Sequence, residues 1–109
     1  MKRAFVYLKK FDDKWNELKL TDDDLIPLEE YLSKNPDAGD VVQGTNGIRK
    51  LRWALQNKGK RGGIRVLYVD IVISEKIYML DLFPKSEKEN ISNEEKSELK
   101  KLVSKLKKE

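Results

Sequence analysis

Two apolar, β-prone runs separated by a short polar turn constrain the fold of this chain most strongly. Residues 64–73 (IRVLYVDIVI) are almost continuously apolar, and residues 77–83 (IYMLDLF) follow after the turn SEK. A long run of β-branched and aromatic residues is typical of a strand that is buried on both faces. Two such runs joined by a short turn predict a hairpin. We therefore expect residues 64–73 to form the central strand of a sheet and residues 77–83 to be its antiparallel partner.

Two further segments extend this sheet. Residues 48–55 alternate, with apolar side chains on one face and Lys50 and Arg52 on the other, as a half-buried strand requires. Residues 3–8 (RAFVYL) predict a short first strand. We expect the helices to cover the face opposite Lys50 and Arg52, which is the face that carries Trp53.

Helical spacing dominates the rest of the N-terminal half. Residues 11–20 place apolar side chains at helical intervals, which predicts a short helix. Thr21 is a candidate N-cap for a second helix, because three aspartates follow it in the first turn, where the helix dipole favours negative charge. Pro27 lacks a backbone donor, so it predicts a bend or a delayed start. The run NPDAG at residues 35–39 ends this helix.

The C-terminal segment predicts one more helix. Ser92 and Glu95 match a capping box, and four apolar residues at helical spacing follow them: Leu99, Leu102, Val103 and Leu106. The expected order is β-α-α-β-β-β-α, without an internal repeat or a linker. We predict one α+β domain over residues 1–109, an antiparallel sheet with two N-terminal helices and a C-terminal helix packed on it.

The charge pattern indicates a binding surface for an anion. Residues 49–68 contain seven basic residues and no acidic one, although the net charge of the whole chain is only +4. A local field of this kind suits phosphates.

The absent residue types exclude much chemistry. The chain has neither histidine nor cysteine, so the usual nucleophilic triads, imidazole acid–base pairs and disulfides are impossible. The aspartates at residues 22–24 fit a helix terminus better than a metal site, and residues 44–50 (GTNGIRK) lack the spacing of a P-loop. We expect no metal and no cofactor. The apolar run at the N-terminus is too short for a signal peptide or a membrane span, so we expect a cytoplasmic protein without a membrane partner.

The basic residues leave three uses open. Lys50 and Arg52 lie two positions apart on one strand, so they project from the same face, roughly 7 Å apart. Arg65 begins the next strand and approaches them if the two strands pair. Such a cluster can bind nucleic acid or a partner without catalysis, can catalyse phosphoryl chemistry, or can be an inert solvated surface. The aromatic residues Trp15, Trp53, Tyr31, Tyr68 and Tyr78 are interpreted as core rather than as base-stacking groups.

A family resemblance favours one of these uses. Residues 35–69 (NPDAGDVVQGTNGIRKLRWALQNKGKRGGIRVLYV) and 82–92 (LFPKSEKENIS) resemble the HigB-like branch of the RelE/ParE toxin superfamily of type II toxin–antitoxin modules. The blocks GTxGxRKxRWA and GKRGGxRVxY carry this resemblance, which extends over nearly the whole chain. It implies a RelE-like fold and a ribosome-dependent, metal-independent endoribonuclease, an mRNA interferase that cleaves the codon in the ribosomal A site by attack of the 2′-hydroxyl.

The resemblance also implies roles for individual residues. Lys50 or Lys85 would transfer protons, and Arg52 and Arg65 would bind the phosphate and stabilise transition-state charge. Four further basic residues would contact RNA or the ribosome: Arg49, Lys58, Lys60 and Arg61. The implied partners are the 30S A site, mRNA and a cognate antitoxin, expected to be a small helix-turn-helix protein. The same fold also includes toxins that poison DNA gyrase, so a gyrase poison or a basic binding protein without catalysis is the alternative.

Overall fold

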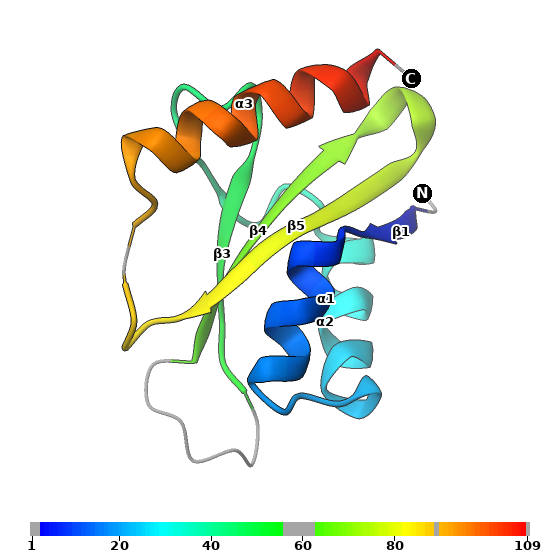
Figure 1. Ribbon diagram of the computed structural model, residues 1–109. Helices are drawn as coiled ribbons and strands as arrows, with labels where there is room; N and C mark the ends of the chain where they lie inside the picture. Colours follow the sequence, from blue (N-terminus) through cyan, green and yellow to red (C-terminus); the bar gives the residue numbers. More distant parts are fainter. Residues whose placement is uncertain (1–2, 56–62, 89, 109) are drawn as a thin grey trace.

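The molecule is built around a five-stranded, twisted sheet. The structure is a computed structural model that describes residues 3–55, 63–88 and 90–108. Its strands are β1 (Ala4–Tyr7), β2 (Asp40–Val41), β3 (Arg49–Trp53), β4 (Ile64–Ile71) and β5 (Lys76–Pro84), in the spatial order β1-β5-β4-β3-β2. Figure 1 shows β4 and β5 crossing the middle of the molecule. The α+β class is therefore confirmed.

The predicted hairpin is present with two differences in detail. β4 ends at Ile71 and is followed by a 3-10 helix over Val72–Ser74 before β5 begins at Lys76. The register of β4 and β5 shifts between Leu67 and Tyr68, which marks a β-bulge. β3, β4 and β5 pair antiparallel, as predicted.

The sheet as a whole is mixed rather than wholly antiparallel. β1 pairs parallel with β5, with Ala4 opposite Lys76 and Tyr7 opposite Met79. Arg3, which precedes β1, connects this edge to β4, because its Nε donates to Asp70 Oδ1 at 2.6 Å. Parallel neighbours need a long crossover, and here α1, α2 and the other strands lie between β1 and β5 in the sequence.

The two N-terminal helices begin near the predicted positions. α1 spans Lys9–Glu17 and α2 spans Asp22–Lys34. Thr21 is the N-cap of α2, and its backbone N–H donates to Asp24 Oδ2 at 2.8 Å in a capping box. Pro27 lies inside α2 without delaying its start, so that part of the prediction is wrong. The strong cap and the buried Leu28 and Leu32 offset the backbone hydrogen bond that proline removes.

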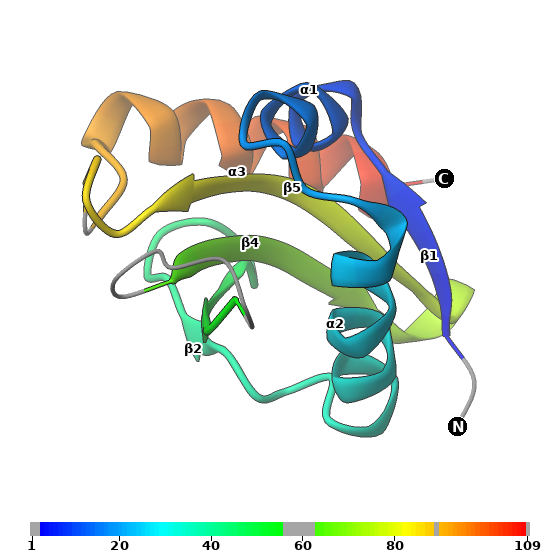
Figure 2. The same ribbon diagram turned by 90° about the horizontal axis from the view of Figure 1, so that it is seen from below.

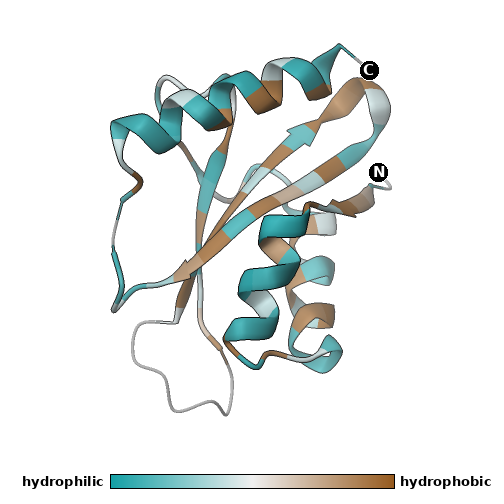
Figure 3. Cartoon of the chain, viewed as in Figure 1, coloured by the Kyte–Doolittle hydropathy of each residue, from teal (hydrophilic) through white to brown (hydrophobic). Residues whose placement is uncertain are grey.

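Both faces of the sheet are covered, and α2 and α3 (Asn93–Lys107) lie on opposite sides of it (Figure 2). One apolar cluster joins α1 and α2 to side chains such as Leu51, Val66 and Tyr68. The other joins α3, through Leu99 and Val103, to the alternate side chains of β4 and β5. The outer faces of the helices are largely hydrophilic (Figure 3). No helix among the described residues is long and apolar enough to cross a membrane.

This arrangement corrects one expectation. Trp53 faces α1 and α2, as predicted, but α3 packs on the face that carries Lys50 and Arg52, because Lys50 lies opposite Leu67 of the α3-side cluster. The reason is the composition of β4, which is apolar on both faces and therefore needs helical cover on each side.

Candidate functional site

The pairing of β3 with β4 brings three of the predicted site residues onto one face. Arg52 lies directly opposite Arg65, and Lys50 lies opposite Leu67. Directly opposed residues in an antiparallel pair project to the same side. The exposures of the two arginines differ, since Arg52 is exposed whereas Arg65 is only 3% exposed. Arg65 is thus a guanidinium held largely within the protein, while Arg52 reaches solvent beside it.

A pocket of about 410 Å³ lies at this end of the sheet, and its basic lining residues are Arg52, Arg65 and Lys85. Its remaining lining residues are Trp53, Ala54, Leu55 and Gly63. We call it the arginine pocket. Lys85 follows β5 directly, and its backbone N–H donates to the carbonyl of Gly63 at 3.3 Å. This contact joins the end of β5 to the start of β4, so a residue remote in sequence completes the pocket.

Gly63 is required by the close approach of the chain here. Its φ is +62°, and a Cβ on it would lie 2.1 Å from the carbonyl oxygen of Trp53. Any other residue would combine a left-handed backbone conformation with a clash against the main chain.

Lys50 lies outside the lining of the arginine pocket but on the same face. Its Nζ donates to Asn90 Oδ1 at 2.8 Å, so the strand residue is joined to the segment that precedes α3. Asn90 was not predicted from the sequence, because the contact spans 40 residues and depends on where α3 packs.

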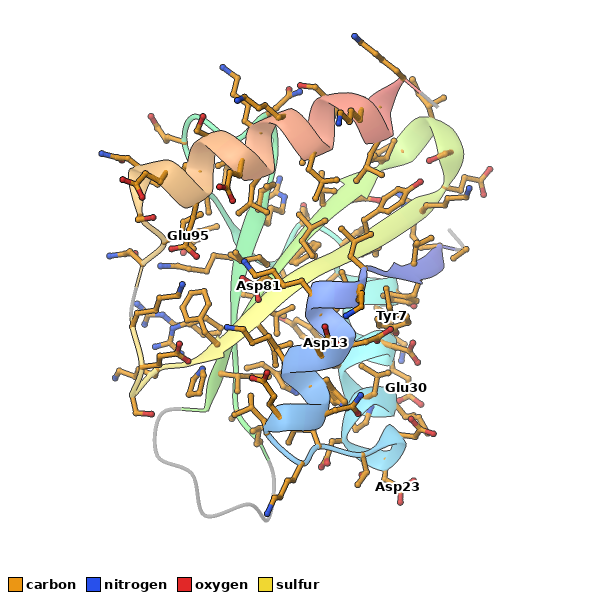
Figure 4. The ribbon with its side chains drawn as sticks, in the orientation of Figure 1. Tyr7, Asp13, Asp23, Glu30, Asp81 and Glu95 are labelled. Carbon is orange, nitrogen blue, oxygen red and sulfur yellow. The ribbon has the colours of Figure 1, made fainter. Side chains whose placement is uncertain are left out.

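A second set of contacts, made by Lys88 and Glu95, stabilises the segment that precedes α3. Ser92 caps α3 in a capping box with Glu95, as predicted. The other carboxylate oxygen of Glu95 accepts from Lys88 Nζ at 2.8 Å, and this Nζ also lies 4.9 Å from the centre of the Phe83 ring. The hydrogen bond from Lys88, followed by that from the Ser92 backbone, lowers the pKa of Glu95 to about 2. Figure 4 shows Glu95 at the start of α3.

Of the other predicted contact residues, the structure describes only Arg49. Arg49 projects to the opposite face, where its Nη1 donates to the carbonyls of Asp37 at 3.1 Å and Gly39 at 2.7 Å. The alternation of β3 therefore separates Arg49 from Lys50 and Arg52, and its contact with RNA or the ribosome stays a prediction. Lys58, Lys60 and Arg61 lie outside the described residues.

The described residues of this site supply positively charged side chains. In the described ranges, no group of three or more His, Cys, Asp or Glu side chains could hold a metal ion. Two guanidinium groups and a lysine around one pocket can bind the oxygens of a phosphodiester. A neighbouring lysine can take part in proton transfer.

Comparisons with known proteins bear on the family and the fold. Residues 3–109 match a family described as the RelE toxin of the RelE/RelB toxin–antitoxin system. The chain is also similar in structure to a doubly substituted mutant of the E. coli toxin RelE in the free state, with a TM-score of 0.62 and 17% sequence identity. That alignment covers 94% of this chain and 99% of the E. coli chain. The likeness confirms the predicted RelE-like fold.

Proposed function

The chain belongs to the RelE toxin family, and from this premise we propose that it is a HigB-like, ribosome-dependent endoribonuclease that cleaves mRNA in the ribosomal A site. The observation that carries the proposal is the arginine pocket, where Arg52, Arg65 and Lys85 meet beside Lys50. The proposed partners are the 30S subunit with its mRNA and a cognate antitoxin, a small helix-turn-helix protein, and the proposed compartment is the cytoplasm.

The proposed reaction is an internal transfer at phosphorus. The 2′-oxygen of one nucleotide bonds to the adjacent phosphorus while the bond from phosphorus to the 5′-oxygen breaks, leaving a 2′,3′-cyclic phosphate. Lys50 or Lys85 accepts the proton of the 2′-hydroxyl, and the other donates a proton to the departing 5′-oxygen. Arg52 and Arg65 bind the nonbridging oxygens and stabilise the charge that grows on them in the transition state.

Dependence on the ribosome follows from the residue types. A chain without histidine lacks the usual acid and base of a self-sufficient ribonuclease near neutral pH. Free RNA rarely aligns its 2′-hydroxyl with the scissile phosphate. A codon held in the A site could be fixed in that alignment, which supplies a large part of the barrier reduction through orientation alone.

The test compares one message free in solution and the same message under translation by 70S ribosomes, in buffer with and without the purified protein. We expect cleavage only on translating ribosomes. Arg52→Ala should lower the rate about 10²–10³-fold with an unchanged fold, since this side chain is exposed. Because Arg65 is buried, Arg65→Lys is the informative change there, and its stability should be measured alongside.

Three results would count against the proposal. Efficient cleavage of naked RNA would refute the ribosome dependence. Growth arrest with intact translated mRNA would favour a target such as gyrase. Binding that weakens gradually with each substitution, without products at any dose, would indicate a basic binding protein.

A further inference from the structure

A second hollow lies on the other side of β3, against α2. It measures about 290 Å³, and its lining residues are Pro27, Glu30, Tyr31, Lys34, Asn35 and Trp53. We call it the aromatic hollow. The rings of Tyr31 and Trp53 lie 5.3 Å apart, tilted by 46°, and Tyr31 is 40% exposed. This exposure contradicts the interpretation of Tyr31 as a core residue.

The aromatic hollow differs from two buried aromatic groups of the described structure. Phe11 and Trp15 stack on one another but are almost fully buried. Tyr68 is also buried, and its hydroxyl donates to the carbonyl of Pro36 while accepting from the N–H of Gly39. These rings are buried in the described fold, whereas the Tyr31 side chain is partly exposed to solvent.

Trp53 connects the aromatic hollow to the arginine pocket, because it contributes to the lining of both. The alternation of β3 sends Arg52 to one face and Trp53 to the other, so the two sites lie on opposite sides of this strand. Within the described residues, β2 pairs with β3 only at Arg49 and Lys50. An RNA strand that passes around the edge of β3, next to the residues paired with β2, would therefore contact the arginine pocket and the aromatic hollow in succession.

The lining of the aromatic hollow suits a nucleobase. The rings of Tyr31 and Trp53 and the pyrrolidine of Pro27 offer apolar surface for a flat heterocycle. Glu30, Lys34 and Asn35 supply acceptors and donors around it, and Figure 4 shows Glu30 on α2 at this side of the molecule. Stacking of a base on an aromatic side chain contributes about 1–3 kcal/mol.

We propose that the aromatic hollow binds one unpaired RNA base, contributed by a nucleotide next to the phosphate that occupies the arginine pocket. This inference rests on the proposed function, because it takes single-stranded RNA to be the ligand of the arginine pocket. The aromatic hollow would thus bind a base, whereas the arginine pocket contacts only the RNA backbone.

The test is equilibrium binding of a 2′-O-methyl RNA hexamer, which lacks the nucleophile and so is not cleaved, measured by fluorescence anisotropy at low salt. Tyr31→Ala should weaken binding about 5- to 150-fold, in line with the loss of one stacked base, and Tyr31→Phe should bind like the wild type. The matched control is Tyr78→Phe, on the α3 side of the sheet. Thermal unfolding should show that Tyr31→Ala is folded.

Hexamers with a single abasic residue at each position then identify the base. At one position the abasic RNA should bind more weakly to the wild type, and Tyr31→Ala should cause no further loss with that RNA. Unchanged hexamer binding by Tyr31→Ala would overturn the inference, including the case where the variant instead loses a protein partner. An equal loss with every abasic hexamer would overturn it too.

These outcomes are separable from a failure of the proposed function. A protein that binds the base but never cleaves translated mRNA would keep this inference and refute the nuclease. A protein that cleaves translated mRNA while Tyr31→Ala binds the hexamer normally would do the reverse.

Discussion

Substitution of Glu95 tests how much its two contacts stabilise the segment that precedes α3. One carboxylate oxygen accepts from the backbone N–H of Ser92 at 3.0 Å, and the other accepts from Lys88 Nζ at 2.8 Å. Glu95→Gln keeps a side chain that can complete the capping box but removes the charge that holds Lys88. Glu95→Ala removes both contacts. Comparison of the two variants therefore separates the contribution of the ion pair from that of the helix cap.

The magnitudes follow from the two contacts. Loss of a helix-capping interaction costs about 1 kcal/mol, and an ion pair between side chains that are 27% and 28% exposed contributes about 0.2–1 kcal/mol. Glu95→Ala should therefore lower the free energy of unfolding by about 1–2 kcal/mol, and Glu95→Gln by about 0.5 kcal/mol. Glu98→Gln, an exposed glutamate on the same helix, is the matched control and should change it little.

The pH dependence tests the cause. The pKa of Glu95 is lowered from 4.5 to about 2, so its contribution is complete above about pH 5 and is lost as the pH falls toward 2. Urea unfolding followed by circular dichroism at pH 7, 5 and 3 should show the gap between wild type and Glu95→Gln narrowing with acidity. A gap that is the same at pH 7 and pH 3 would show that the charge of Glu95 is not what stabilises the segment.

Three further predictions address other parts of the molecule. Gly63→Ala should destabilise the fold by about 2 kcal/mol or more in urea unfolding, because its Cβ would meet the Trp53 carbonyl at a positive φ; a neutral result would refute the close approach. Tyr68→Phe should cost about 1–3 kcal/mol, since it leaves the buried N–H of Gly39 without its acceptor, and a loss below about 0.5 kcal/mol would contradict that contact. Arg52→Ala should reduce the slope of log affinity for RNA against log salt by about 1, while Arg49→Ala should leave the slope unchanged and lower stability instead; equal slopes for the two variants would contradict their placement on opposite faces.

Local patterns were sufficient to predict most elements of this fold. The alternation in β3 placed Trp53 opposite Lys50, and the capping boxes at Thr21 and Ser92 marked the starts of two helices. These predictions depend on neighbours within four residues, which the sequence displays directly. β2 was not predicted, because a two-residue strand leaves no periodicity to detect.

Features that depend on the packing of elements remote in sequence were predicted less well. The two-sided apolar character of β4 indicated cover on both faces, yet α3 was assigned to the same face as the other helices. That error hid the contact between Lys50 and Asn90. The meeting of Arg52 with Arg65 was predicted from the pairing of their strands, whereas the solvent exposure of Tyr31 depends on how α2 lies against the end of β3 and has no sequence signal.

The parallel pairing of β1 with β5 has a consequence for the order of folding. Arg3 and Asp70 are 67 residues apart, so the first strand to leave the ribosome has no neighbour until the last strand has been made. Closing so long a loop carries an entropic penalty that local contacts avoid. The arginine pocket likewise needs Lys85, which follows β5. A ribosome that synthesises this chain therefore faces only an unfinished sheet until β5 and Lys85 have been made, and shorter nascent chains lack the complete pocket.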